Sequence, residues 1–301
     1  MKTLLSCFFI ASLLSAQTDS LPTSLVFLSD TQAPMWIEKL YLKDYGNEKA
    51  TQNIFSSILK EKNLAAVVHC GDITAYGMSR SKWKAVLPFI DSLKTKSIPF
   101  IAAKGNHDYY FFSGRALARY EEYIPDGKNE FSIHQFGNTA IVALNSNFEE
   151  LEDSTREQQQ AWYASTLQQC DADSSVHFII TVAHHSPFTN STMVSGSSFI
   201  RKDYLPYFYA SPKSKLFVGG HAHRFEHFRR KGKNFLVIGG GGGLFHDKRT
   251  ENPLVDLHKD DGKFFHYMKC SMYRDSLAFD IVKVESHSSE AATAYRFVVH
   301  R

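Results

Sequence analysis

The stretch IPFIAAKGNHDYYFF spans residues 98–112 and joins an apolar run to a polar turn. The run at 98–103 predicts a buried strand, and the tetrapeptide GNHD (105–108) follows where that strand should end. Polar residues that follow a single strand are common in ordinary turns. They indicate a functional site only if other parts of the chain supply matching groups.

Six further apolar runs resemble the one that precedes GNHD. They are short and rich in Val, Ile and Phe, which is typical of strands buried on both faces. These runs lie at residues 24–29, 64–70, 139–144, 176–183, 215–220 and 235–240.

Helical patterns lie between several of these runs. Residues 48–62 place apolar side chains on one face, and residues 79–94 continue the pattern but contain Pro88, which predicts a kink. Residues 154–169 begin with Ser154, and a Glu three residues later completes a capping signal.

The alternation of strands and helices predicts an α/β layered domain. The C-terminal part differs, because residues 264–300 predict several strands in succession. A mixed sheet or a second sheet is therefore expected to include this part.

Polar side chains that can bind metals follow five of the seven apolar runs. In open α/β sheets, ligands bind outside the carboxyl ends of the strands. Carboxylate, amide and imidazole groups at that edge suit divalent first-row metals. The groups are Asp30 and Gln32, Asp72, the GNHD block, His184 and His185, and His221 and His223.

The order of these five blocks resembles the calcineurin-like metallophosphoesterase superfamily. The segments AHHSPFTNS (183–191) and VIGGGGGL (237–244) look most like its purple-acid-phosphatase-like branch. The resemblance covers roughly residues 24–245 and implies an α/β fold. The implied architecture is a four-layer αββα sandwich of two mixed β-sheets flanked by helices, with a dinuclear metal site at the carboxyl-terminal edge of the strands.

The resemblance also implies two transition-metal ions, either divalent or trivalent, with Mn, Fe and Zn as the candidates. Asp72 would bridge the two ions. The first ion would take Asp30, His223 and Gln32, and the second would take Asn106, His184 and His221. His185 stays open as the alternative to His184.

The same resemblance assigns roles in catalysis. His107 would bind the substrate phosphate beside Asn106 and support or protonate the leaving oxygen, while a metal-bridging hydroxide attacks phosphorus. Asp108 would either orient His107 or cap the next segment. Two metals that clamp a phosphate and activate water provide an independent chemical reason for these residue types, and imidazole suits proton transfer near neutral pH.

Two positions depart from the family pattern. Many relatives carry His at the position of Gln32, whose amide oxygen can ligate a metal without adding charge; a hydrogen-bonding role is the alternative. Tyr76 lies four residues after Asp72, whereas the iron-binding Tyr of purple acid phosphatases lies three after the matching Asp. An Fe(III)–tyrosinate site is therefore not expected, and Tyr76 should line the substrate pocket or pack. Arg115 either binds phosphate or is solvated.

The N-terminus has the pattern of a secretory signal peptide at residues 1–16, so residues 17–301 are expected to form a single calcineurin-like domain. This predicts an exported protein, periplasmic or secreted, without stable membrane insertion after signal removal; an uncleaved anchor is the alternative. The formal net charge of +3 gives no argument for nucleic-acid binding.

We therefore expect an exported dinuclear-metal phosphoester hydrolase that acts on small-molecule or protein phosphoesters. Phosphomonoesterase activity is the leading hypothesis. A phosphodiesterase that acts on cyclic nucleotides or phospholipid head groups shares all the metal residues and is the first alternative. A non-catalytic metal- or ligand-binding relative is the second. The sequence does not predict an oligomeric state.

Overall fold

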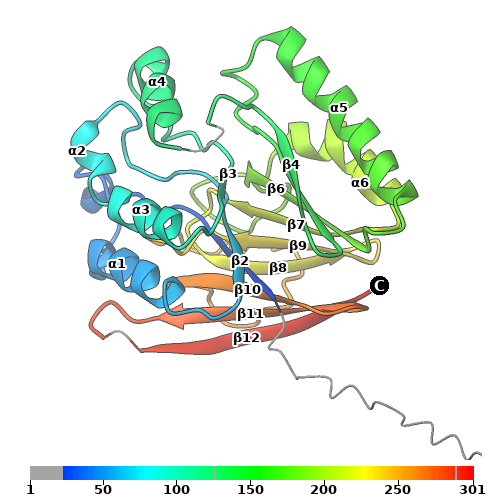
Figure 1. The fold of residues 1–301 in the computed structure, drawn as a ribbon. Coiled ribbons are helices and arrows are strands. Elements are labelled where there is room, and N and C mark those ends of the chain that lie inside the picture. Colours follow the sequence, from blue (N-terminus) through cyan, green and yellow to red (C-terminus); the bar gives the residue numbers. More distant parts are fainter. Residues whose placement is uncertain (1–22, 125–126, 289) are drawn as a thin grey trace, which may run out of the picture.

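Two mixed β-sheets stack face to face, and helices cover both outer faces (Figure 1). This computed structural model describes residues 23–124, 127–288 and 290–301. The arrangement confirms the expected four-layer sandwich. The predicted signal peptide lies outside the described residues, so the division of the chain at residue 16 stays a prediction.

The first sheet, sheet A, has the strand order β12-β11-β10-β1-β2-β3. Strands β1, β2 and β3 are parallel, and β10 joins β1 in antiparallel register, with Leu25 opposite Cys270. The C-terminal strands therefore extend sheet A rather than form a sheet of their own. The strands are β1 (Ser24–Leu28), β2 (Leu64–His69), β3 (Phe100–Ala102), β10 (His266–Met272), β11 (Ser276–Val284) and β12 (Ala291–His300).

The second sheet, sheet B, has the strand order β4-β5-β6-β7-β9-β8. Its four central strands are parallel, and antiparallel strands β4 and β8 close its two edges. The strands are β4 (Ser132–Phe136), β5 (Thr139–Ala143), β6 (Phe178–His185), β7 (Ser214–Gly220), β8 (Phe225–Arg230) and β9 (Lys233–Ile238).

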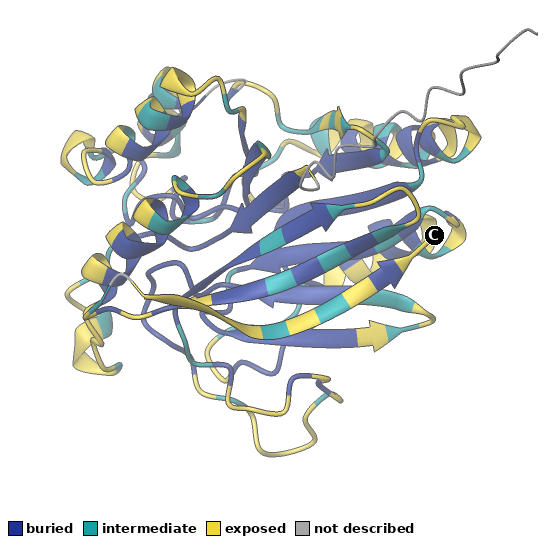
Figure 2. Ribbon diagram, turned by 60° about the horizontal axis from the view of Figure 1, so that its bottom comes forward, coloured by how far each residue is buried: buried dark blue, intermediate teal, exposed yellow. Residues whose placement is uncertain are grey.

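Burial on both faces explains the continuous apolar runs. Along β1, Leu25 and Phe27 join the core between the two sheets, while Val26 and Leu28 join the core beneath the helices. Side chains alternate between the faces of a strand, so a strand inside a four-layer sandwich needs apolar residues at every position. The outer strand β12 is instead banded with exposed residues, as Figure 2 shows for the strands nearest the viewer.

The helices follow the predicted positions with two corrections. Pro88 does not kink one long helix; it lies in the first turn of α3, where its missing N–H costs nothing, and α2 is a separate turn. Helix α5 begins at Asp153 after Glu152 without a side-chain cap, so the predicted Ser154 cap is wrong. The helices are α1 (Asn47–Ile58), α2 (Arg80–Trp83), α3 (Leu87–Thr95), α4 (Ser113–Tyr123), α5 (Asp153–Ala172), α6 (Leu205–Ala210), η1 (Glu38–Leu40) and η2 (Ile200–Tyr204).

The cysteines contribute apolar volume to the cores. Cys70, Cys170 and Cys270 are free and buried, as expected of small apolar side chains. None of the helices in the described ranges has the length and apolar character that crossing a bilayer requires.

Candidate dinuclear metal site

The two sheets bring all five sequence blocks to one edge of the sandwich. Asp30, Asp72 and the GNHD block follow the parallel strands β1, β2 and β3 of sheet A. His184 and His185 end β6 of sheet B, and GHAH (220–223) follows its neighbour β7. The juxtaposition expected from the sequence is therefore present.

Three of these residues have left-handed backbone conformations. The φ angles are 58° at Asp30, 57° at Asp72 and 68° at His221. Positive φ angles are uncommon in residues other than Gly, although Asp and His adopt them more often than most. Such conformations persist where surrounding contacts fix them, and they cluster at functional sites. Here the carboxylate of Asp30 accepts hydrogen bonds of 3.1 Å from the backbone N–H of His221, which fixes that turn.

Asp72 lies at the centre of the site. Its Oδ1 accepts a 2.8 Å hydrogen bond from the backbone N–H of His107. Its Oδ2 lies 3.3 Å from Nε2 of His184, and Gln32 Nε2 is 3.5 Å from the same oxygen. Oδ1 therefore fixes the GNHD turn, while Oδ2 faces the side chains of His184 and Gln32.

His184 is oriented as a metal-binding imidazole is. Its Nδ1 donates to the carbonyl of Cys70 over 3.0 Å, which points Nε2 toward Oδ1 of Asn106, also 3.0 Å away. A neutral imidazole in this tautomer turns a lone pair toward the oxygens of Asn106 and Asp72. The lone pair and these oxygens repel each other, and a cation between them would relieve that repulsion. A His that binds a metal usually donates its other ring N–H to a carbonyl or carboxylate, as His184 does to Cys70.

His223 repeats this arrangement on the other side of the site. Its Nδ1 donates to the carbonyl of Leu244 over 2.8 Å, and its Nε2 lies 3.4 Å from Oδ1 of Asp30. Nε2 of Gln32 is 3.1 Å from the same His223 nitrogen, whereas Oε1 of Gln32 is buried without a hydrogen-bond partner. An orphaned buried oxygen is costly, and metal ligation would satisfy it. The residues present therefore fit two metal ions.

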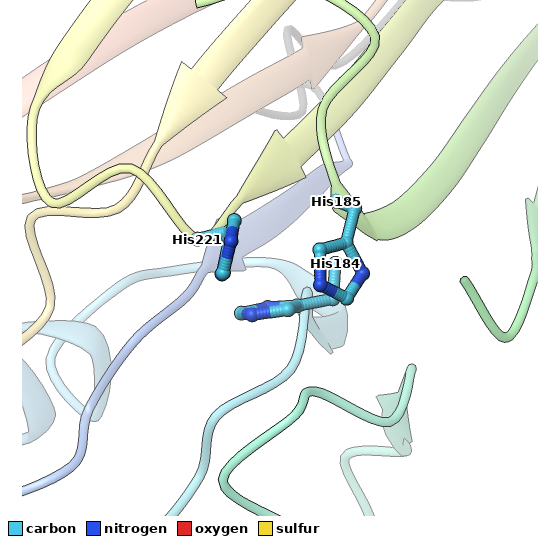
Figure 3. Close-up of side chains that lie close together, drawn as sticks. All are labelled: His184, His185 and His221. Atoms are coloured by element: carbon cyan, nitrogen blue, oxygen red, sulfur yellow. The ribbon is translucent and has the colours of Figure 1, made fainter. Parts of the chain in front are cut away.

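Two groups of side chains are spaced closely enough to hold an ion. One comprises Asp30, Asp72 and His184, and the other comprises His184, His185 and His221. Figure 3 shows the three imidazoles of the second group converging from the ends of β6 and β7. Nδ1 of His185 lies 2.9 Å from Oγ of Ser146, and this hydrogen bond fixes the ring and leaves Nε2 free to bind a metal. The choice between His184 and His185 stays open.

The charges of the site are arranged to favour bound cations. Burial opposes ionisation of Asp72, but the neighbouring His184 and His107 outweigh it and lower the pKa of this carboxyl. Burial likewise disfavours the charged form of His184, yet Asp72 and Asp30 raise the pKa of its imidazole to about 9. The buried carboxylates thus attract a positive charge strongly enough to protonate a buried histidine, and a metal ion would take the place of that proton.

Comparison with known proteins identifies the family. A family model of the calcineurin-like phosphoesterases matches residues 23–225. The chain belongs to the calcineurin-like phosphoesterase family. Members of this family use dinuclear metal centres, and the chain is a metal-dependent phosphoester hydrolase. No curated protein sequence matches the chain significantly.

Solved structures share the fold of this calcineurin-like phosphoesterase at low sequence identity. A purple acid phosphatase from yellow lupin (Lupinus luteus) seeds is 15% identical, with a TM-score of 0.68 over 93% of this chain and 54% of its own. The chain thus spans about half the length of the lupin enzyme. GAP50, the inner-membrane-complex anchor of Plasmodium, is 16% identical, with a TM-score of 0.67 over 93% of this chain and 89% of its own. A dimetal phosphatase from Danio rerio is 14% identical, with a TM-score of 0.62 over 93% and 99%.

His107 is fixed beside the metal residues of this phosphoesterase. Its Nδ1 donates to the carbonyl of Ala75 over 3.0 Å, and its ring lies 4.3 Å from that of Tyr110. Its Nε2 is left 3.8 Å from Oδ2 of Asp72. The imidazole therefore presents Nε2 toward the atoms that would surround a bound phosphate.

Asp108 does not orient His107, so that prediction is wrong. The carboxylate is fully buried and accepts hydrogen bonds from the backbone N–H groups of Gly105, Asp72 and Ile73 at 2.9–3.2 Å. Burial and the charge of Asp72 raise its pKa to about 7. Asp108 joins the GD turn to the GNHD turn. The carbonyl of Ala75, rather than Asp108, orients the ring of His107.

The structure does not bring Arg115 to the site. It is exposed on α4, and its guanidinium lies over the ring of Phe112 at 5.7 Å. Tyr76 packs against Phe111, with ring centroids 5.3 Å apart, which agrees with the packing alternative.

Sequence reasoning missed Tyr110, whose hydroxyl accepts a 3.1 Å hydrogen bond from Nδ2 of Asn106. Its position three residues after His107 was the available signal. It also missed the carbonyls of Cys70, Leu244 and Ala75, because a backbone carbonyl leaves no mark in the sequence.

Proposed function

We propose that this phosphoesterase is an exported phosphomonoesterase in which His107 protonates the leaving oxygen. The observation that carries the proposal is the fixed orientation of His107: Nδ1 is engaged by Ala75, and Nε2 faces the site 3.8 Å from Asp72. General acids must lie within reach of the atom that they protonate, and this nitrogen is the one directed at the metal residues.

We propose the two ligand sets that the family resemblance implies. Asp30, Gln32 and His223 would hold one ion, Asn106, His221 and either His184 or His185 would hold the other, and Asp72 would lie between them. Bound ions of the Mn, Fe or Zn type would polarise the phosphate and activate water for attack.

The protein's own side chains carry the rest of the reaction. Asn106 and His107 orient the phosphate. Water loses one proton to solvent as its oxygen bonds to phosphorus. The bond from phosphorus to the alcohol breaks, the proton on Nε2 of His107 passes to the leaving oxygen, and His107 then regains a proton from solvent. The hydrogen bond to Ala75 holds Nδ1 protonated throughout.

Export rests on the N-terminal sequence and is tested separately. Mass spectrometry of the protein recovered from the periplasm or culture medium should give an N-terminus at Gln17. Recovery of the full-length chain in the cell membrane would instead support an uncleaved anchor.

Two chromogenic substrates test the reaction class. The purple acid phosphatase and dimetal phosphatase folds favour the monoester. A cavity of about 410 Å³ beside Asn106 and His185 has room for a second ester substituent and keeps a phosphodiesterase as the second candidate. We expect metal-loaded protein to hydrolyse 4-nitrophenyl phosphate faster than bis(4-nitrophenyl) phosphate. The reverse preference would make it a phosphodiesterase. No turnover with both metals bound would support a non-catalytic binding protein, and GAP50, described as an anchor, has a similar fold.

A further inference from the structure

A cavity opens directly beside the proposed metal site. Its volume is about 410 Å³, and Asn106 and His185 form its metal-facing wall. Ser146, whose hydroxyl pairs with His185, lies next to them. The remaining wall combines carboxylates with aromatic rings and includes Tyr110, Phe148, Glu149, Glu150 and Phe199.

The position of the cavity identifies which part of a substrate it would hold. Tyr110 lines the cavity and also lies against His107, with ring centroids 4.3 Å apart. In the proposed reaction, His107 protonates the leaving oxygen. The alcohol that bears this oxygen must therefore lie on the His107 side of the phosphate, and the cavity next to Tyr110 is the space available there.

The side chains that line the cavity carry negative charge, while Arg156 and Arg201 donate hydrogen bonds to the backbone carbonyls of Phe148 and Gly196 in its wall. Glu149 and Glu150 are exposed, and no Lys or Arg lies among the described residues that line the cavity. Oγ of Ser113 donates a 3.0 Å hydrogen bond to Glu150, which holds this carboxylate while leaving its charge unpaired. An anionic leaving group would be repelled there, and a cationic one would be attracted.

Aromatic rings supply a second feature that suits a cation. Phe148 is buried and Phe199 is 43% exposed, and their ring centroids lie 5.3 Å apart. Tyr110 adds a third ring on the metal side. Aromatic faces attract ammonium groups, most strongly where water is excluded. Carboxylates and aromatic rings in one cavity are the combination that binds alkylammonium ions.

We propose that this cavity is the leaving-group subsite of the enzyme and that it takes an alcohol bearing an ammonium group. The inference rests on the proposed phosphoester hydrolysis and names its substrate class. The ammonium group stays unchanged in the reaction, because only the bond between phosphorus and the alcohol oxygen breaks. Free amino-alcohol phosphates and lysine-containing phosphopeptides both present this chemistry.

A pair of matched substrates tests the subsite. Phosphocholine and 3,3-dimethylbutyl phosphate have nearly the same shape, but only the first carries a cation. We expect kcat/KM of the metal-loaded enzyme to favour phosphocholine by about 10-fold, the ratio that corresponds to 1.4 kcal/mol. The ratio should fall below about 3 in a Glu149→Gln/Glu150→Gln double variant. Equal rates with the two substrates, or a ratio unchanged in the double variant, would overturn the proposal.

A control variant and a binding measurement separate this inference from the proposed function. Glu285→Gln/Glu290→Gln removes the same charge from the connection between β11 and β12 and should keep the ratio. Calorimetric titration of the two phosphates into metal-loaded protein measures the same preference without turnover. If neither ester is hydrolysed, the proposed function fails, whereas the binding ratio still decides the subsite.

The source of the ammonium group is then distinguished by rate. Phosphocholine and a phosphoserine peptide with an adjacent lysine are compared at equal concentration. The better substrate identifies whether a free ester or a protein presents the cation.

Discussion

The backbone N–H of His107 donates a 2.8 Å hydrogen bond to Oδ1 of Asp72. This bond joins the GNHD turn after β3 to the GD turn after β2. The two carboxylate oxygens of Asp72 therefore have different roles. Oδ1 fixes the backbone, while Oδ2 faces His184 and the ring of His107. The hydrogen bond to Oδ1 therefore links the proposed bridging ligand directly to the backbone of the proposed acid.

Replacing Asp72 tests its place between the ions. Asn at this position tolerates the left-handed backbone and can still accept from His107, but it carries no charge. Removing a residue that only hydrogen-bonds to a metal ligand costs about 10–100-fold in metal affinity or activity. Loss of the Asp72 carboxylate, a proposed ligand itself, should therefore lower kcat/KM by more than about 100-fold and reduce the amount of bound metal. Elemental analysis and phosphatase assays measure both effects, with Asp91→Asn on exposed α3 as the control. Full metal content with undiminished turnover would remove Asp72 from the site.

His107→Asn separates proton transfer from metal binding. An alkyl phosphate needs a proton on its leaving oxygen, whereas 4-nitrophenolate leaves readily without one. Loss of a general acid costs about 10²–10⁴-fold, so kcat for an alkyl phosphate should fall by that factor, and kcat for 4-nitrophenyl phosphate should fall less. The metal content should be unchanged. An equal loss with both substrates would contradict the role of His107 as the acid.

A pair of glycine substitutions tests how tightly the metal edge is packed. A Cβ at Gly220 would lie 2.0 Å from Oγ of Ser29 and 2.2 Å from Oδ2 of Asp30, whereas a Cβ at Gly114 would meet no atom within 4 Å. Gly220→Ala should therefore lower both metal affinity and the melting temperature. Gly114→Ala, in the first turn of α4, should leave metal affinity unchanged and raise stability by about 0.5–1 kcal/mol. Similar behaviour of the two variants would contradict this interpretation.

The strand framework of the site was predictable because it depends on local patterns. Apolar runs followed by Asp30, Asp72 and His184 marked buried parallel strands and their ligand-bearing ends. The partners of these side chains were not predictable. Asp108 looked like an orienting acid because it follows His107, yet its carboxylate turns back to three backbone N–H groups. Only the packing of two turns against each other creates that cluster of donors.

The acidic wall of the cavity beside the site was not predictable for a similar reason. Glu149 and Glu150 follow β5 without a distinctive motif, and Phe199 comes from a segment about fifty residues later. Their proximity to Tyr110 depends on how the loops of sheet B close over the edge. Arg115 was considered as a phosphate ligand, but its guanidinium lies over the ring of Phe112.

Removing one partner of a buried ion pair next to the site should destabilise the fold strongly. Nε of Arg224 lies 3.2 Å from Oε1 of Glu226, and both side chains are fully buried. Burial raises the pKa of Glu226 to about 7, so unfolding should be measured at pH 8, where the carboxylate is ionised. Glu226→Gln leaves Arg224 buried without its counter-charge and should lower the free energy of unfolding by about 3–5 kcal/mol. Chemical denaturation measures this loss, and exposed Glu285→Gln should cost under about 0.5 kcal/mol. A loss as small as that of the control would show that the pair is dispensable.

His266 should make stability depend on pH. Burial lowers the pKa of this imidazole to about 4, although its hydrogen bond to the carbonyl of Phe264 opposes the shift. The unfolded chain binds a proton at His266 below about pH 6.5, so the free energy of unfolding falls as pH drops from 6.5 toward 4. In His266→Gln this slope should be shallower by up to about 1.4 kcal/mol per pH unit. Denaturation curves at pH 7, 6 and 5 measure it, with exposed His300→Gln as the control; parallel slopes in wild type and His266→Gln would exclude the assignment.

The candidate ligands are divided between the two sheets. Asp30, Asp72 and Asn106 extend from sheet A, and His184, His185 and His221 extend from sheet B. Any ion held by members of both sets would fasten one layer of the sandwich to the other, at the end of the apolar core that they share. A ligand that binds only the folded state stabilises it, so metal ions bound here would stabilise the folded protein. The ligands that hold the ions for catalysis would also fix the position of one sheet relative to the other.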